Sequence, residues 1–339
     1  MNLKKQNFLK QISALKISRL DTTQKTDISC IPEKRYTAQM KQLIIPYLKQ
    51  YVESGFYHGL YYELYPRDNP LGTIVISYGF TESCEKYREL IYYFHKQGYQ
   101  VAIMDHRGHG KSVREVDNKS IVHISHFSQY VKDLHRFIRA KVYPMRKGKP
   151  LYLFAHSMGG CIGTLYLEKH PKVFTKAVLS APMLEIQIGR IPHWTADCIC
   201  RLSILLGQGN KRVFAMQEFQ EEEPFSMSAA NSAARHAYYR QIQKKHSEYQ
   251  TNCGSYQWVH EAIHAGKIAL KLKNIKRISS PVLLFQATDD TFVTSRAHKI
   301  FINNILDGRI ILAKSRHEIW RCTNNILEPY LAEIFSFLQ

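Results

Sequence analysis

The amino-acid sequence predicts an α/β fold with a mostly parallel central sheet, helices on both of its faces and one helical insertion. Two patterns support this prediction. Short β-branched runs alternate with amphipathic segments from residue 55 onward, as in chains that build parallel sheets. The alternation stops after Pro182 and resumes at Pro281. With 339 residues, 45% hydrophobic and 22% charged, the chain suits one large domain with an insertion and excludes wholesale disorder.

The expected elements follow in chain order. Before the interruption we expect strands at residues 73–78, 101–104, 151–155 and 176–180, with helices between them at 84–97, 124–142 and 159–169. Gly98 ends the first of these helices, and the other two are expected to end before Pro144 and Pro171, because proline interrupts a helix. After the interruption we expect strands at residues 281–286 and 309–313 and a last helix at 323–338.

Residues 183–266 lack strand alternation and contain helical segments, so we expect them to form a cap over the carboxyl edge of the sheet, where open α/β proteins bind ligands. The predicted parts are a basic N-terminal segment (1–30), the first part of the core (31–182), the cap (183–266) and the second part of the core (267–339). Seven large apolar residues of the cap either line a site beneath it or simply pack the cap; they are Trp194, Leu202, Ile204, Leu205, Leu206, Phe214 and Phe219.

The N-terminal segment has two interpretations. Its first 20 residues carry five basic and no acidic side chains, and Phe8, Ile12 and Leu15 fall on one face of a helix. Such a helix can lie on an anionic bilayer or be an ordinary surface helix. No apolar run has the roughly 18 residues of a membrane span, and no apolar core of a secretory signal is present.

The net charge and the cysteines indicate the kind of partner and the cellular compartment. A net charge of +19 favours polyanionic partners, either nucleic acid or an anionic membrane surface. The seven cysteines are scattered without a repeated CxxC pair, so we expect neither a disulfide framework nor a zinc site. A reducing compartment follows, and we expect a cytoplasmic protein held peripherally on the inner face of the cytoplasmic membrane.

The strongest chemical signal is Ala155-His-Ser157-Met-Gly159, which connects a predicted strand directly to a predicted helix. This is the context of a nucleophile elbow, G-x-S-x-G, with Ala155 in place of the first glycine. A serine hydroxyl needs a histidine base and a carboxylate that orients the base. The alternative is a small-residue turn that packs under a helix.

The partners of Ser157 are expected after the last two strands. His317 follows the strand at 309–313 and is the predicted base, while Asp290, with Asp289 as the alternative, follows the strand at 281–286. The oxyanion is expected to accept hydrogen bonds from the backbone N–H groups of Met158 and Phe80.

Two other known motifs are matched only in part. Gly110-Lys-Ser112 lacks the first glycine of a P-loop, since residue 105 is aspartate, so no nucleotide is expected. His317-Glu318 is not a zinc motif, because residue 321 is arginine. We therefore expect no cofactor and no catalytic metal.

Taken together, the motifs resemble those of the monoglyceride lipase and lysophospholipase branch of the α/β-hydrolases. The resemblance covers about residues 45–339 and rests on Tyr78-Gly-Phe-Thr-Glu82, Asp105-His-Arg-Gly-His-Gly-Lys-Ser112, the Ser157 elbow, the Asp290 loop and His317-Glu318. The insertion is similar to that of the bacterial lysophospholipase L2 enzymes, in Ala181-Pro-Met183 followed by residues 188–200 and in residues 254–262 with Ala265-Gly266. Tyr78 departs from the pattern, because much of the branch has histidine there.

The resemblance implies an α/β-hydrolase fold and hydrolysis of the fatty acyl ester of a lysophospholipid through an acyl-enzyme. A monoacylglycerol, another carboxylic ester or an amide are alternative substrates. A catalytically silent protein that binds a membrane or nucleic acid is the non-enzymatic alternative, but no nucleic-acid-binding motif accompanies the charge, so we expect no nucleic acid. The oligomeric state stays open.

Overall fold

The computed structural model describes residues 16–23, 26–189 and 191–339. Within these ranges nine strands form one sheet in the order β1-β11-β10-β8-β7-β4-β5-β3-β2. Its strands are β1 (Ile17–Arg19), β2 (Glu53–Tyr57), β3 (Leu60–Tyr65), β4 (Thr73–Ser77), β5 (Gln100–Met104), β7 (Leu151–His156), β8 (Lys176–Ser180), β10 (Val282–Ala287) and β11 (Gly308–Ala313). Only β3 pairs in antiparallel fashion with its neighbours β2 and β5, so the predicted mostly parallel sheet is confirmed.

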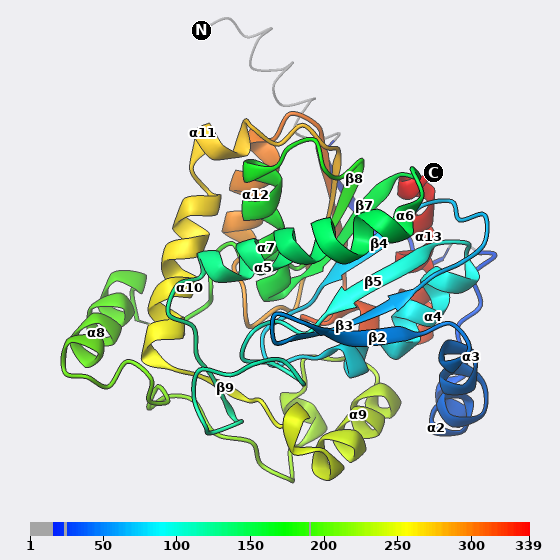
Figure 1. The fold of residues 1–339 in the computed structure, drawn as a ribbon. Coiled ribbons are helices and arrows are strands. Elements are labelled where there is room, and N and C mark those ends of the chain that lie inside the picture. The colour runs from blue at the N-terminus through cyan, green and yellow to red at the C-terminus, as the bar shows by residue number, and fades with distance from the viewer. Residues whose placement is uncertain (1–15, 24–25, 190) are drawn as a thin grey trace, which may run out of the picture.

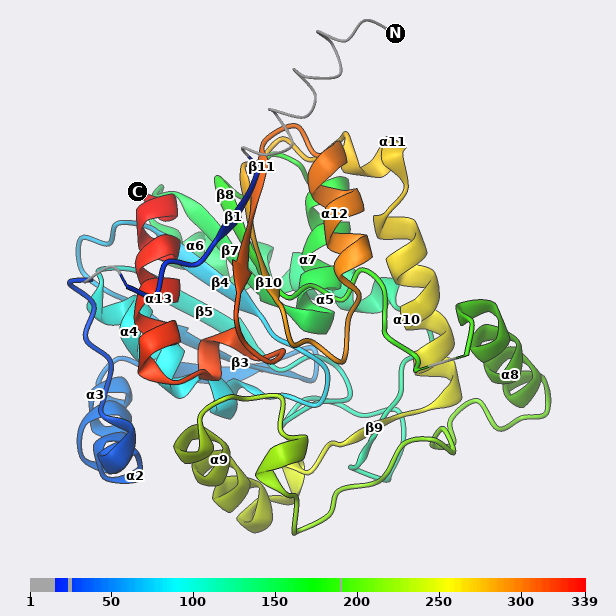
Figure 2. The same cartoon turned by 180° about the vertical axis from the view of Figure 1, so that it is seen from behind.

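Helices cover both faces of the sheet (Figures 1 and 2). One face carries α5 (Ser128–Phe137), α7 (Ser157–Lys169), α10 (Tyr256–Ala269) and α12 (Ser295–Asn304). The other carries α4 (Arg88–Lys96) and α13 (Asn324–Leu338), with α2 (Tyr36–Gln39) and α3 (Ile45–Lys49) beside them. The short helices α6 (Tyr143–Arg146) and α11 (Leu272–Ile275) complete the core.

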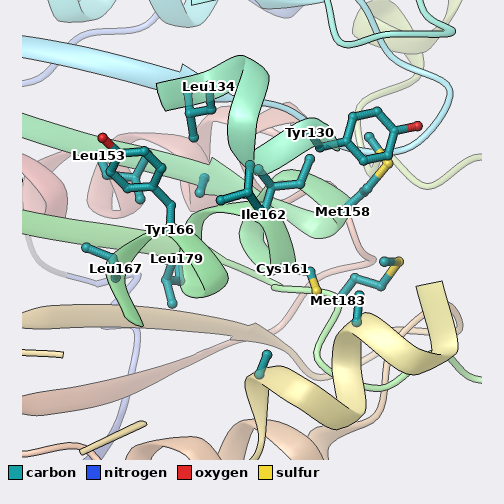
Figure 3. Packing of buried hydrophobic residues seen from close by; sticks show 14 of the residues in the cluster. Tyr130, Leu134, Leu153, Met158, Cys161, Ile162, Tyr166, Leu167, Leu179 and Met183 are labelled. Carbon is teal, nitrogen blue, oxygen red and sulfur yellow. The ribbon is translucent and has the colours of Figure 1, made fainter. Parts of the chain in front are cut away.

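Alternate residues of the strands fill two separate cores. Leu153 and Ala155 of β7 belong to the core beneath α5 and α7, whereas Tyr152 and Phe154 belong to the core beneath α4 and α13. Figure 3 shows the first core, in which Ile162 and other α7 side chains pack among residues of neighbouring elements. Both faces of β7 are therefore buried, which explains its continuous apolar sequence.

The cap lies at the carboxyl end of the strands and contains α8 (His193–Leu205), α9 (Ala233–Lys245) and the first part of α10 (Figure 1). A two-residue strand, β9 (Cys253–Gly254), pairs with β6 (Ile121–Val122) and attaches the cap to the core. The predicted boundary at residue 266 falls within α10, which continues to Ala269 as one helix.

One expectation about helices requires correction, and another falls outside the described residues. The helix predicted at residues 124–142 begins at Ser128 and, beyond a π-helical turn at Ile138–Val142, continues through Pro144 to Arg146. Pro144 directly follows the π-helical turn, in which the Tyr143 N–H donates to the Ile138 carbonyl five residues earlier, so the helix is locally widened where the proline lacks an N–H. The predicted N-terminal helix with Phe8, Ile12 and Leu15 lies outside the described residues, and Ile17–Arg19 of the same segment form strand β1 on β11.

Candidate active site

Ser157 stands at a sharp turn between β7 and α7. Its φ angle is +51°, in the left-handed region that a side chain rarely adopts. The turn requires small neighbours: a Cβ atom on Gly159 would lie 2.0 Å from the Ser77 carbonyl oxygen. Ala155 is accommodated because Gly163 faces it, and a Cβ atom there would come within 3.1 Å of the Ala155 methyl. The departure from the elbow pattern is thus matched by a glycine one helical turn further on.

The structure brings the three predicted side chains together. The Nε2 atom of His317 lies 2.7 Å from the Ser157 hydroxyl oxygen, and its Nδ1 atom lies 2.7 Å from the Oδ2 atom of Asp290. Ser157 follows β7, Asp290 follows β10 and His317 follows β11, so all three stand at carboxyl ends of parallel strands. Asp289 is exposed and does not contact His317; its Oδ1 atom accepts a hydrogen bond from the hydroxyl of Thr288.

Asp290 is held in its ionised form. Burial by itself raises the pKa of this carboxyl, but the hydrogen bond and charge of His317 together with the N–H groups of Phe292 and Val293 lower the pKa below its usual value. His156 next to the site differs, since burial lowers its pKa to about 4. At neutral pH, His156 is therefore uncharged beside the ring of His317.

The two loops predicted to supply the oxyanion hole adjoin Ser157. Met158 is the second residue of α7, so its N–H is one of the helix N–H groups that have no partner inside the helix. A Cβ atom on Gly79 would lie 3.0 Å from the Ser157 Cβ, which places the Gly79-Phe80 backbone against the nucleophile. The donor roles of Phe80 and Met158 stay predictions.

A buried chain of charges, which was not predicted from the sequence, connects these loops. Glu82 accepts hydrogen bonds from the Gly79 N–H (2.6 Å) and from the Lys86 ammonium (3.0 Å). Lys86 also donates to Glu318 at 2.5 Å, and Glu318 pairs with Arg321 at 2.7 Å. Burial raises the pKa of Glu318, but Lys86 and Arg321 lower it overall. The Gly79 loop is thereby tied to the residue that follows His317; the signal was present in Glu82 and Glu318 of the motifs.

Tyr78, the residue that departs from the pattern of the motifs, is buried in a hydrogen-bond network. Its hydroxyl donates to Asp105 at 3.0 Å and accepts from the His106 N–H at 2.7 Å. The other Asp105 oxygen accepts from the Lys111 N–H at 2.9 Å. A Cβ atom on Gly110 would lie 2.1 Å from that carboxylate oxygen. The 105–112 loop therefore wraps around its own carboxylate, which supports the exclusion of a phosphate-binding loop.

Ser157 and His317 open into a pocket of about 450 Å³ between the core and the cap. One part of the lining is apolar and consists of Phe80, Met183, Ile186, Met216, Trp258, Phe292 and Val293. Another part carries three cationic and three acidic side chains, which are Lys86, Arg240, Arg321, Glu82, Glu223 and Glu318. The lining therefore offers apolar side chains together with charged ones that pair with each other.

The proposed cap lining is wrong. None of the seven apolar residues suggested from the sequence lines the pocket. Five of them are exposed (Trp194, Leu202, Leu205, Leu206 and Phe214), and Ile204 and Phe219 are partly exposed. For the residues on α8 the reason is the orientation of the helix, whose buried residues are the small or polar Ala196, Asp197 and Cys200, so its large apolar side chains point outward. Phe214 and Phe219 lie in the segment that follows α8.

Comparison with known proteins gives consistent matches. The family model described as "Serine aminopeptidase, S33" matches residues 68–321. Lysophospholipase L2 of Escherichia coli K12 is 34% identical over 239 residues, which are 67% of this chain and 66% of that protein, so the match spans just under two thirds of this relative. The probable lysophospholipase L2 of Haemophilus influenzae is 29% identical over 78% of this chain and 83% of its own.

A solved structure also matches. It is a soluble variant of monoglyceride lipase from Saccharomyces cerevisiae in complex with a substrate analogue, with a TM-score of 0.67 and 19% identity, covering 85% of this chain and 93% of that one. At this identity the match concerns the fold alone.

Proposed function

Because the chain belongs to the serine aminopeptidase S33 family and has the α/β-hydrolase fold, we propose that it hydrolyses the fatty acyl ester of a lysophospholipid with Ser157 as nucleophile. The observation that carries the proposal is the continuous hydrogen-bond chain from Ser157 through His317 to Asp290, of which Ser157 and His317 line the pocket. Similarity to enzymes named lysophospholipase L2 supports the choice of substrate class.

The proposed reaction has two halves. The Ser157 oxygen attacks the acyl carbonyl carbon while its proton passes to Nε2 of His317, and Asp290 stabilises the resulting imidazolium. The N–H groups of Phe80 and Met158 donate to the oxyanion. The carbon–oxygen bond to glycerol then breaks, and His317 gives its proton to the leaving oxygen. In the second half, water attacks the acyl-enzyme by the same route, releasing the fatty acid and restoring Ser157.

Similarity to the enzymes named lysophospholipase L2 is what favours a lysophospholipid over a neutral lipid. The apolar side chains of the pocket suit a single acyl chain. The charged side chains of the lining pair with one another, Lys86 with Glu82 and Glu318 and Arg240 with Glu223, so they add no preference for a charged head group. From the named relatives we expect lysophosphatidylethanolamine to be a better substrate than a monoacylglycerol.

We also propose that the enzyme works on an anionic membrane surface, held there peripherally in the cytoplasm. The outer side of α8 exposes Trp194 (68%) and Leu205 (83%), next to the exposed Leu202 and Leu206. These four residues are here called the α8 apolar face, and helix α8 itself lies at the periphery of the molecule in both views (Figures 1 and 2). Apolar side chains on a chain of net charge +19 suit insertion at an anionic interface. Among the described helices, none is long and apolar enough to cross a bilayer.

A two-step experiment tests the reaction. A fluorophosphonate probe should label the wild type and not Ser157→Ala. A panel of lysophosphatidylethanolamine, monoacylglycerol, a short p-nitrophenyl ester and an aminoacyl amide then identifies the substrate. We expect Ser157→Ala to reduce kcat on lysophosphatidylethanolamine about 10⁶-fold, because the triad members act as a unit. Labelling of the variant, or turnover of the amide alone, would contradict the proposal.

A further inference from the structure

A second cluster of polar side chains lies in the cap, apart from the pocket that holds Ser157. His260 and His264 stand on α10, and Asp197 stands on α8. The Nδ1 atom of His260 lies 2.7 Å from Oδ1 of Asp197, and the Nε2 atom of His264 lies 3.3 Å from Oδ2 of the same carboxylate. The buried carboxylate on α8 is thus approached by two imidazole rings from the adjacent helix α10.

The arrangement has the geometry of a metal site. Residues four apart on a helix project from the same face, which directs both imidazole rings toward α8. One ligand atom from each of the three residues lies within 4.8 Å of the other two, close enough to surround one ion. Within residues 16–23, 26–189 and 191–339, these three side chains are the one group of histidine, cysteine and carboxylate residues that meets this condition.

We propose that Asp197, His260 and His264 bind one divalent transition-metal ion, with zinc as the best match. Two imidazole nitrogens and one carboxylate oxygen are ligands that zinc accepts, and water can complete a four-coordinate shell. Calcium and magnesium prefer shells made of oxygen atoms alone, so two nitrogen ligands select against them. When the ion binds, each ring offers the lone pair of the nitrogen that now faces Asp197, and its proton resides on the other ring nitrogen.

The residues around the three ligands leave the site accessible from solvent and suggest a structural role for the ion. Asp197 is only 8% exposed, but the side chain of His264 is 47% exposed and lines a cleft of about 500 Å³ open to solvent. The ion would cross-link α8 to α10, and α10 in turn packs on α7 of the core. It would therefore fix the orientation of the helix that carries the α8 apolar face. This role does not depend on the ester chemistry proposed for Ser157.

Metal binding can be measured on the untagged full chain after dialysis against a chelator. Zn²⁺ is titrated calorimetrically, Co²⁺ is followed by its visible absorption, and the melting temperature is recorded with and without Zn²⁺. The variants are Asp197→Asn and His264→Ala. The control is His126→Ala, an exposed histidine that lines the same cleft and lies 3.8 Å from Glu261.

The wild type and His126→Ala should bind one Zn²⁺ per chain, show Co²⁺ bands of a nitrogen-and-oxygen site, and melt at a higher temperature with Zn²⁺. His264→Ala and Asp197→Asn should lose at least about 100-fold in affinity and show no zinc-dependent rise in melting temperature. The half-exposed His264 keeps the test valid if Asp197→Asn fails to fold. Absence of saturable binding to the wild type, or equal binding by His264→Ala, would overturn the proposal.

Discussion

The elbow around Ser157 and the helix α8 differ in how strongly packing restricts the residue type at each position. At the elbow, backbone packing leaves no choice: Gly159 has no room for a Cβ atom, and the nucleophile has a strained φ angle of +51°. On α8, large apolar residues stay at the surface while Ala196, Asp197 and Cys200 are buried. At the elbow, the residue types therefore indicate their structural roles. On α8, an apolar residue type is compatible with either a buried or an exposed position.

The largest effect that distinguishes these regions should come from the acid of the triad. We expect Asp290→Asn to lower kcat about 10⁴-fold, because the amide no longer stabilises the charged His317 in its catalytic orientation. Asp289→Asn is the matched control, one residue away and exposed, and should keep nearly full activity. Steady-state kinetics on a soluble ester measures both, and equal losses in the two variants would remove Asp290 from the mechanism.

The features that could be predicted from the sequence are those that local packing and strand order determine. Strand runs such as Leu151–His156 are buried on both faces, so their continuous apolar sequence has one interpretation, and the loops after β10 and β11 follow from strand order. The charge chain through Lys86 was missed because Glu318 lies 232 positions from Lys86, although Glu82 stands only four residues before Lys86. The face of α8 was misjudged because burial of its small residues against α10 is a tertiary contact.

The buried charge chain of the core can be broken at its centre. Lys86→Met should lower the free energy of unfolding by about 3–5 kcal/mol, since Glu82 and Glu318 would each lose a buried partner. The comparison is Lys244→Met in the cap, whose pair with Glu222 is exposed and should contribute no more than about 1 kcal/mol. Chemical denaturation measures both. Similar small losses would show that the core chain is not a source of stability.

The α8 apolar face can be tested without touching the catalytic residues. Leu205→Ser combined with Leu206→Ser should weaken co-sedimentation with phosphatidylglycerol vesicles at least tenfold, because each inserted leucine contributes about 1.5–3 kcal/mol. Activity on a soluble short ester should stay unchanged. Leu306→Ser is the matched control, since Leu306 is 80% exposed but lies at the opposite end of the strands, before β11. Equal loss of vesicle binding with Leu306→Ser would contradict a specific α8 contact.

The smallest effect concerns a buried acid that, unlike Glu82 and Glu318, forms no ion pair with another of the described residues. Burial raises the pKa of Glu168 on α7 to about 8, despite the charge of Arg277, and its Oε1 atom has no hydrogen-bond partner within the described structure. The folded chain then keeps a proton that the unfolded chain releases near pH 4.5. The free energy of unfolding should therefore fall as the pH rises from about 5 to 8.

Glu168→Gln removes this ionisation at every pH. At pH 8 the variant should be more stable than the wild type by roughly 1–3 kcal/mol, and at pH 5 the two should nearly coincide. Glu53→Gln on the exposed strand β2 is the control and should leave the pH profile unchanged. Denaturation curves recorded at several pH values measure the difference. A difference in the free energy of unfolding that is the same at every pH would show that changed packing determines the effect, and not an unpaired buried carboxylate. Buried acids of this core would then be tolerated without a partner such as Lys86.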